Sequence, residues 1–323
     1  STPPKNKKLP LWDFPDQKGE PVLKWASNIN PYLADAPNVL LSSRSRPLDS
    51  NTPLMVKGSQ PTDSGYLSDL SAEDAAKIRE SDPIAAKYLR PLVGAKELIN
   101  STDRYCLWLV DAEPSDIRKS AILSERVNAV KEYRLSSSKA KTREDASRPA
   151  EFQEIRQPSS PYIAVPLVSS ETRDYVPMSL LSPEVIANNL ISTVPNGSLW
   201  TFGFLMSRPF NVWNKTVSGR LESRTRISGT ITYNNFPFPE TTAEQDEEIE
   251  KCGQEVIHVR EGFPNSSLAD LYDPTTMPSE LRKAHQALDK AVLSAFGLKA
   301  SATDEAVLAE LFRRYEELTR GLL

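Results

Sequence analysis

The sequence predicts an α+β fold, in which a mixed, largely antiparallel sheet with helices is followed by a small all-α helical domain. Two observations lead to this prediction. Apolar, β-branched segments separated by turn residues recur between residues 154 and 236, as expected for strands of one sheet. After Phe238-Pro239 the sequence changes to three charged segments with apolar residues at helical spacing. A chain of 323 residues has room for about two domains.

Residues 1–65 are rich in Pro, Ser, Asn and Asp and contain only short apolar pieces, such as PVLKW, NVLLSS and PLMVKG. This composition is typical of irregular chain with a few short strands. We therefore expect this segment to lie on another surface rather than to form a core of its own.

Residues 66–239 are expected to form the α+β domain. Ser71-Ala-Glu-Asp74 has the N-cap and the acidic third position of a helix start, and this helix should end at Asp82-Pro83. A second helical stretch of one or two turns is expected from Pro83 to Leu92. KELIN and RYCLWLV, separated by the polar NSTD, then predict a hairpin.

Residues 114–135 place apolar side chains at spacings near three and four, which predicts an amphipathic helix. The polar, basic segment SSSKAKTREDASRPAEF that follows predicts a mobile surface loop or a ragged helix. The segment 198–217, SLWTFGFLMSRPFNVWNKTV, is apolar enough for a buried helix. Four further segments are predicted as strands of one sheet: EIRQ, PYIAVPLVSS, DYVPMSLL and GTITYNNF.

Residues 240–323 are expected to form the helical C-terminal domain. Proline, glycine and aspartate signals divide it into helices over 241–261, 278–297 and 303–321, and the last two have typical helix starts. Each of these two helices also carries an apolar stripe, which predicts a small bundle.

No catalytic centre and no metal site is predicted in this chain. His258 and His285 are the only histidines and both lie in predicted helices, and Cys106 and Cys252 are too few for a disulfide framework or a zinc site. No glycine-rich phosphate loop is present. Apolar runs are far shorter than the ~20 residues that cross a bilayer, so a cytoplasmic protein with no membrane partner is expected.

The net charge of −4 is unevenly distributed, with the positive excess concentrated in residues 101–228 and the negative excess in 229–323. Such a modest excess does not identify a nucleic-acid-binding protein by itself. It does indicate which part of the chain to inspect for a polyanion site.

Arg220, Glu222, Arg224 and Arg226 alternate in SGRLESRTRIS, so an extended chain would place all four side chains on one face. In a DNA major groove, arginine donates to guanine O6 and N7, and a carboxylate accepts from cytosine N4. Glu222 and Arg224 are therefore a plausible reader of one G·C pair, with Arg220 and Arg226 on flanking phosphates. From the pattern alone, a salt-bridge ladder on a solvated strand is the simpler explanation.

Other basic and hydroxyl side chains would follow a duplex backbone if the fold brought them to one surface. Each of them alone is more simply explained as solvated surface. They are Lys139, Lys141, Arg143, Arg148, Arg156, Ser169, Ser170, Arg173, Arg208 and Lys215.

From about Ile29 to the C-terminus, the chain resembles the C-terminal half of the MmeI-like enzymes, which are large single-chain bacterial restriction and modification proteins. The segments that carry the resemblance keep the order and similar spacing of the family: PLMVKGSQPTDSGYL, AAKYLRPLVGAKELINSTDRYCLWLVDA, EIRQPSSPYIAVPLVSSETRDYVPMSLL, LWTFGFLMSRPFNVWNKTVSGRLESRTRIS, TYNNFPFP and ADLYDPTTMPSELRKAHQALDKAV.

The resemblance implies a DNA target recognition domain over 66–239 and a helical C-terminal domain over 240–323. The base-specifying pair of the family's Gly-Arg-Leu segment falls on Glu222 and Arg224. Two departures affect individual contacts: Ile227 replaces a usual aromatic, and Phe210-Asn211 replaces a frequent Met and His.

In this family an upstream domain binds S-adenosylmethionine and carries an Asn-Pro-Pro-Tyr motif that methylates adenine N6, and many members add a nuclease. This sequence contains neither the motif nor a nuclease, so it looks like one part of such an enzyme, with no cofactor of its own. Residues 1–65 would then pack against the methyltransferase domain.

Three functions remain open. The first is recognition of double-stranded DNA for an adenine methyltransferase. The second is a protein-interaction module whose acidic helices bind a partner. The third is a metal nuclease using Asp16, Glu20 and Lys24, although three residues separate Glu20 from Lys24 where the nuclease motif has one.

Overall fold

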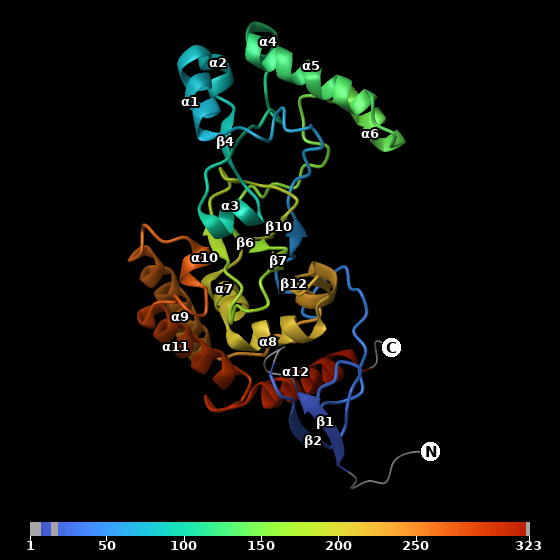
Figure 1. Ribbon diagram of the computed structural model, residues 1–323, viewed down its shortest axis with the longest axis vertical. Coiled ribbons are helices and arrows are strands. Elements are labelled where there is room, and N and C mark those ends of the chain that lie inside the picture. The colour runs from blue at the N-terminus through green and yellow to red at the C-terminus, as the bar shows by residue number, and fades with distance from the viewer. Residues whose placement is uncertain (1–7, 14–18, 321–323) are drawn as a thin grey trace.

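The computed structural model describes residues 8–13 and 19–320. Its elements form two unequal lobes joined by a narrower waist, and a two-stranded hairpin lies at the far end of the larger lobe, near the N-terminus (Figure 1). Within the described ranges, no helix has the length and apolar character needed to cross a membrane. The predicted α+β fold with a helical C-terminal region is confirmed.

The smaller lobe consists of short helices around a core that includes Leu107, Leu123 and Val130, all fully buried. The predicted capping box is confirmed, because the Ser71 side chain accepts from the Asp74 amide and the Asp74 carboxylate accepts from the Ser71 amide. The helices of this lobe are α1 (Ala72–Ser81), α2 (Pro83–Ala86), α4 (Pro114–Lys119), α5 (Ala121–Leu135) and α6 (Ala140–Glu144), followed by the 3₁₀ turn η1 (Asp145–Ser147). The short helix α3 (Ala95–Asn100) lies at the waist, where its Leu98 packs with Tyr162 and Ala164 (Figure 1).

The predicted helix over 114–135 is interrupted at Ser120. This residue has extended backbone angles, and its hydroxyl accepts a 3.0 Å hydrogen bond from the Leu123 amide, so it ends α4 and caps α5. The ragged-helix alternative for the following polar segment is confirmed by α6 and η1.

The predicted hairpin of KELIN with RYCLWLV is wrong. KELIN lies in α3, because the Glu97 carboxylate accepts a 2.8 Å hydrogen bond from the Gly94 amide at the helix start. The true partner of β5 (Tyr105–Leu107) is β4 (Leu89–Val93), which pairs with it in antiparallel register. Helix over the whole of 83–92 is also wrong, since α2 ends at Ala86.

A four-stranded antiparallel sheet forms the centre of the larger lobe. Its order is β3 (Val56–Lys57), β10 (Ile191–Pro195), β6 (Tyr162–Pro166) and β8 (Ser179–Leu181). The PYIAVPLVSS strand is confirmed, whereas DYVPMSLL is a strand only in β8 and EIRQ makes a single bridge, between Gln60 and Glu154. β9 (Ile186–Ala187) pairs in parallel with β4 and thereby connects the two lobes.

The predicted strand over GTITYNNF is wrong, because this segment forms the π-helical turn η2 (Gly229–Tyr233). The Ser228 hydroxyl accepts from the Ile231 amide at its start, and the Asn235 side-chain amide donates to the carbonyls of Thr230 and Ile231. These side-chain hydrogen bonds satisfy the backbone of the turn and outweigh the β propensity of its residues.

The predicted buried helix over 198–217 is two helices, α7 (Leu199–Met206) and α8 (Arg208–Val217). The break falls at Ser207, just before Pro209, which has no amide hydrogen to continue the α7 ladder. Phe202, Phe204 and Trp213 are fully buried, which confirms that this segment is a core element.

The three C-terminal helical segments are confirmed. They contain α9 (Ala243–Glu261), α11 (Ser279–Ala295) and α12 (Asp304–Thr319), with the short α10 (Leu268–Leu271) between the first two. Their apolar faces share one core with the central sheet, α7 and α8: Trp213 of α8 lies 5.1 Å from Phe312 of α12 between ring centroids. The residues before and after residue 240 therefore belong to one continuous core.

Residues 19–65 lie largely on the larger lobe. The Asn234 and Asn235 side-chain amides donate to the Arg44 and Ser42 carbonyls, and Tyr32 stacks on Phe312 at 5.4 Å. Of the short apolar pieces, PVLKW contributes to β2 (Val22–Ala26), which pairs with β1 (Leu9–Asp13), PLMVKG contributes β3, and NVLLSS is not a strand.

Candidate nucleic-acid interface

The four alternating charges of the predicted basic strand lie on a tight hairpin. β11 (Arg220–Leu221) pairs with β12 (Arg224–Arg226), and Glu222 and Ser223 form the turn between them. On its other side β12 pairs with β7 (Val168–Ser169). The expectation that all four side chains share one face is therefore wrong, because the chain reverses direction in the middle of the pattern.

The register assigns the side chains to faces. Arg224 and Arg226 lie on one face of β12 together with Leu221, which is directly opposite Arg224. Arg220 lies opposite Thr225 and therefore on the other face. The hairpin thus presents two guanidiniums on one face and one on the other.

Glu222 occupies the tip of the hairpin with φ of 58°. For a residue with a Cβ atom, this left-handed region is less stable by about 1 to 2 kcal/mol than the right-handed region. The Arg226 amide donates to the Gly219 carbonyl and the Ile227 amide donates to the Leu167 carbonyl, each at 2.9 Å, and these bonds hold the strands that impose the turn. Non-glycine residues held in this conformation occur preferentially at functional sites.

Glu222 and Arg224 are paired but exposed. Arg224 Nη2 lies 2.8 Å from a Glu222 carboxylate oxygen, and their side chains are 78% exposed for Glu222 and 47% for Arg224. Exposed ion pairs contribute little net stability. Both groups can therefore exchange this contact for a ligand while the hairpin stays intact.

Glu171 is a second carboxylate at the hairpin tip, and it is absent from the residues predicted from the sequence. Extending the pairing of Thr225 with Ser169 by two residues brings Glu171 opposite Ser223. Its own backbone amide, the Ser223 hydroxyl, and the charges of Arg220 and Arg224 lower the pKa of the Glu171 carboxyl. Glu171 follows β7 and lies some fifty positions before the hairpin in the sequence. No short motif can therefore include both.

A groove of about 400 Å³ lies beside the hairpin, between it and the edge of the central sheet. Lys57 of β3 and Arg226 of β12 line it together with Ser192 and the backbone of Gly219 and Gly229. Lys57 is not among the site residues predicted from the sequence. The groove brings two cations from distant parts of the sequence to one concave surface.

Comparison with known proteins then decides the family. The family model for the MmeI target recognition domain matches residues 35–240, and the model for the MmeI C-terminal domain matches 241–323. The chain belongs to the MmeI family. DNA methyltransferase A of Bacillus subtilis (strain 168) is 38% identical over 296 residues, which cover 92% of this chain and 33% of that protein.

The Type IIL restriction-modification enzyme MmeI, solved in complex with DNA, superposes on this chain with a TM-score of 0.90 and 40% identity. The match covers 98% of this chain and 42% of that one. This MmeI-family chain therefore spans about a third of the curated relative and less than half of the solved one.

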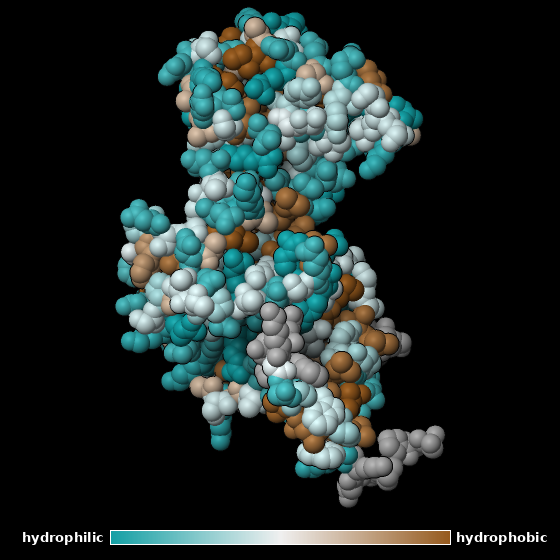
Figure 2. Space-filling model, in the orientation of Figure 1, coloured by the Kyte–Doolittle hydropathy of each residue, from teal (hydrophilic) through white to brown (hydrophobic). Residues whose placement is uncertain are grey.

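Within the MmeI-family chain, the predicted basic loop is the helix α6, which lies on the same side of the waist as β12 (Figures 1 and 2). Lys139, Lys141 and Arg143 are exposed there. Lys141 lies 3.2 Å from the buried Asp145, and Arg143 donates to the Ser137 carbonyl at 2.7 Å. These cations border the same concave side as the hairpin.

The other seven candidates contact the protein itself or are partly buried. Arg148 pairs with Asp145 and Glu151, and Lys215 is half-buried in α8. Ser169 is buried beneath it, so its hydroxyl is not on the exposed surface, whereas Ser170 pairs with Thr172 at 2.9 Å. Arg173 is half-buried towards Asp273, and its desolvation lowers the pKa of the guanidinium. Arg156 pairs with Glu154 near β3, and Arg208 pairs with Asp304 of α12 at 2.6 Å.

The two departures from the MmeI-family pattern are both buried. Ile227 lies in the main core, so this position does not offer a stacking surface. Asn211 Oδ1 accepts a 2.8 Å hydrogen bond from the Val176 amide, which ties α8 to the connection that carries Glu171. Ile227 therefore anchors the chain after β12 in the core, and Asn211 fixes the segment that follows Glu171.

The nuclease alternative falls partly outside the described residues, since Asp16 is not among them. Lys24 pairs with Asp13 and Glu305, and in the described ranges no group of three or more His, Cys, Asp and Glu side chains is arranged to hold a metal ion. His258 and His285 lie in α9 and α11, and burial lowers the pKa of His285 well below its ordinary value.

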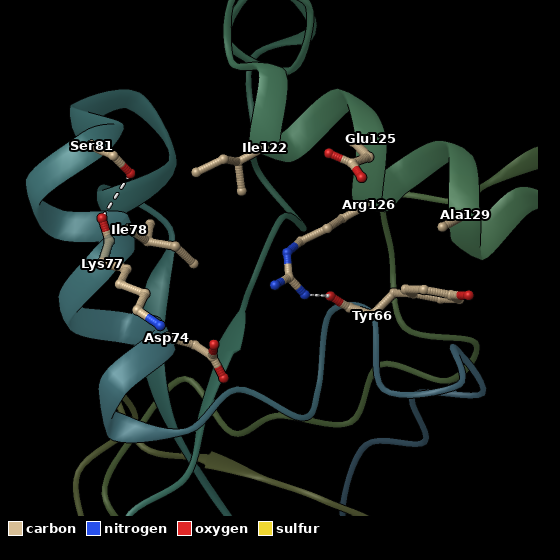
Figure 3. A pocket seen from close by; sticks show the side chains of 9 residues that line it. All are labelled: Tyr66, Asp74, Lys77, Ile78, Ser81, Ile122, Glu125, Arg126 and Ala129. Atoms are coloured by element: carbon tan, nitrogen blue, oxygen red, sulfur yellow. Dashed lines mark hydrogen bonds between the residues drawn. The ribbon is translucent and has the colours of Figure 1, made fainter.

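A hollow of about 420 Å³ lies between α1 and α5 of the smaller lobe. Figure 3 shows Arg126 pointing from α5 towards Tyr66, whose carbonyl it contacts at 2.6 Å, while Lys77 and Asp74 lie on the α1 side. Side chains of both charges line this hollow, and the Arg126 guanidinium already donates a hydrogen bond to the Tyr66 carbonyl. The hollow therefore does not extend the basic surface.

Proposed function

We propose that this chain recognises a specific double-stranded DNA sequence for an S-adenosylmethionine-dependent adenine-N6 methyltransferase of a bacterial restriction-modification system. The observation that carries the proposal is the exposed pairing of Glu222 and Arg224 at a rigid hairpin tip. The solved relative's complex with DNA and the family of the chain support it.

The hairpin suits a major groove in size and in chemistry. A two-stranded ribbon fits into that groove, where arginine donates to guanine O6 and N7 and a carboxylate accepts from cytosine N4. On binding, Glu222 and Arg224 would exchange their mutual contact for contacts with the two bases of one pair. Glu171, which faces the same turn, would act as a further acceptor or hold Arg220 in place.

Backbone contacts would position the duplex without reading its sequence. Arg220, Arg226 and Lys57 flank the proposed reading pair, and Lys139, Lys141 and Arg143 border the same concave side. Ser170, Arg156 and Arg173 are secondary candidates, whereas Arg208 would require its ion pair with Asp304 to open.

Catalysis would belong to the methyltransferase part of the enzyme, which would bind S-adenosylmethionine and accept the flipped adenine in the cytoplasm. Flipping a base out of the stack costs a few kcal/mol. The contacts made by this chain would hold the duplex while that cost is met. Residues 66–239 and 240–323 would form the recognition and C-terminal domains, with parts of 1–65 facing the methyltransferase.

The test exchanges the charges of the reading pair. In the enzyme reassembled with its methyltransferase part, Glu222→Lys with Arg224→Asp should change the preferred base pair at one position of the site. Each good base contact discriminates by about 1 to 3 kcal/mol, so the preference should change by roughly tenfold or more. Methylation of a randomised duplex library, read by sequencing, measures this preference.

The matched control swaps an exposed ion pair on α1, Glu73→Lys with Lys77→Asp, and should leave the preference unchanged. An unaltered preference in the Glu222 and Arg224 variant would refute their reading role.

A second experiment tests duplex binding by the chain itself. Fluorescence anisotropy at two salt concentrations should show salt-sensitive binding that the triple alanine variant of Arg220, Arg224 and Arg226 weakens. The salt slope is the change in the logarithm of the binding constant with the logarithm of the salt concentration. It should become about 0.9 less steep for each removed cation that neutralises a phosphate. Equal affinity of the triple alanine variant and the unaltered chain would show that DNA binds to another surface. No binding at either salt concentration, in the chain and in the reassembled enzyme, would favour the protein-interaction alternative.

A further inference from the structure

The β1–β2 hairpin displays an apolar face that no described residue covers. Pro10 pairs with Trp25 and Trp12 pairs with Leu23, so these four side chains share one face of the hairpin. All four are exposed, with Trp12 at 56% and Trp25 at 58%. Figure 2 shows brown residues beside paler ones at this end of the molecule; on the hydropathy scale of that figure, tryptophan and proline are among the paler or teal residues.

The opposite face of the same hairpin is fixed to the larger lobe. Lys24 forms an ion pair with Asp13 of β1 at 2.6 Å and another with Glu305 at the start of α12. Ala26 is buried, and the Asp35 carboxylate accepts hydrogen bonds from the Ser27 and Asn28 amides where the chain leaves β2. The tryptophan face is therefore held outward in a defined orientation.

Exposure of this apolar face to water is unfavourable in free energy. A two-stranded hairpin is only marginally stable by itself, and here just one of its two sides packs on the protein. Tryptophan is the residue most typical of interface hot spots, because it combines a large apolar area with an indole N–H that needs an acceptor. Two of them on one small ribbon, with Pro10 and Leu23 around them, form a compact docking surface.

We propose that the face of Pro10, Trp12, Leu23 and Trp25 docks the methyltransferase part of the enzyme. In both relatives, more than half of the length lies outside the match to this chain, and the match includes the C-terminal domain of the family. The remaining length of such a protein therefore joins the fold at its N-terminal end. The hairpin lies at that end (Figure 1).

The chemistry of the face specifies its occupant further. It carries no charged side chain, so it suits an apolar concave surface with acceptors for the indole N–H groups rather than a nucleic-acid backbone. The inference depends on the proposed function only in naming a methyltransferase as the partner. It does not depend on which residues read DNA.

The experiment uses the 323-residue chain and a methyltransferase part taken from the Bacillus subtilis relative outside the matched region. Binding of S-adenosylmethionine first shows that this part is folded. Association is measured by isothermal titration calorimetry and by the shift of tryptophan emission. Replacement of Trp12→Ser or Trp25→Ser should weaken the association by about thirtyfold or more. Tyr133→Ser with Leu135→Ser, exposed on α5 in the other lobe, is the matched control and should have no effect.

Binding that resists both tryptophan replacements, or no binding at all, would overturn the inference. Sedimentation of the chain alone tests for self-association. Self-association that the tryptophan variants abolish would assign the face to a second copy of the chain, and this result would also overturn the inference. Duplex binding measured on the same variants separates this test from the proposed function, because a docking variant should still bind DNA through the β11–β12 hairpin.

Discussion

Replacement of Arg134→Lys should loosen the segment that carries the α6 cations. Arg134 is fully buried at the end of α5, and its guanidinium donates five hydrogen bonds to backbone carbonyls. Their acceptors belong to two separate stretches of chain: Pro61 and Thr62 on one side, and Asp145, Arg148 and Glu151 on the other. The side chain thereby joins the α6–η1 segment to the body of the protein.

The expected magnitude follows from the number of donors. Lysine has three N–H donors, so at least two of the five carbonyls lose their partner. A hydrogen bond to a charged group contributes about 1.5 to 3 kcal/mol. Because some of these carbonyls lie close enough to the surface to bind water, we take the lower value and expect a loss of about 3 kcal/mol in the local opening free energy.

Amide hydrogen exchange measures this local opening. A loss of about 3 kcal/mol should accelerate exchange of the Gln153 amide, which donates to the Pro61 carbonyl, by about a hundredfold. Amides of β6 and β10 serve as internal references. Arg143→Lys is the matched control, because the Arg143 guanidinium donates to a backbone carbonyl at the exposed surface.

Equal exchange of the Gln153 amide in Arg134→Lys and the unaltered chain would refute the reasoning. If α6 contacts the duplex, the same variant should also show a smaller salt slope in DNA binding, because its cations would no longer be held in place.

Three further predictions concern buried groups. Burial raises the pKa of Asp289 to about 6, so the folded state holds this proton more tightly than the unfolded chain, and stability should fall by up to about 3 kcal/mol from pH 4 to pH 7. Urea unfolding should show that this part of the pH dependence disappears in Asp289→Asn. A Cβ at Gly58 would lie 2.3 Å from the Asn188 carbonyl oxygen, whereas a Cβ at Gly219 meets no atom within 4 Å. Gly58→Ala should therefore lower the melting temperature and Gly219→Ala should not; equal effects would contradict this. The buried Thr225 hydroxyl has no hydrogen-bond partner among the described residues, so Thr225→Val should leave stability unchanged or raise it by about 1 kcal/mol in the same urea assay, and a clear loss would be inconsistent with that reasoning.

Elements with strong local signals are predictable from the sequence. The N-caps Ser71, Thr242 and Thr303 each accept a hydrogen bond from an amide three residues later, and the helices that follow them agree with the prediction. Strand β6 of the central sheet is apolar and fully buried, so its run of consecutive apolar residues is also informative.

Elements decided by tertiary contacts are not predictable in this way. The turn at Glu222-Ser223 contains no Gly, Asn or Pro, and the alternating charges on either side look the same in a hairpin as in one long strand. The side-chain hydrogen bonds that convert GTITYNNF into a turn involve Asn235 at its end and Ser228 before it.

The candidate site shows the same limit. Glu222 and Arg224 stand together in sequence, so a short motif identifies them. Glu171 and Lys57 reach the same surface from distant positions through β7 and β3, and only the pairing of these strands brings them there. A sequence pattern therefore indicates the centre of the proposed site but not the residues that surround it.

The core shared by the central sheet and the C-terminal helices has a consequence for exchanging parts between related proteins. A Cβ at Gly203 of α7 would lie 2.7 Å from the Ile249 side chain of α9, and one at Gly253 of α9 would lie 3.2 Å from the Leu199 carbonyl oxygen. Helices this close are matched to each other residue by residue. A chimaera spliced near residue 240 would combine two unmatched surfaces, whereas a transplant limited to residues 219–226 would change the hairpin and leave that contact intact.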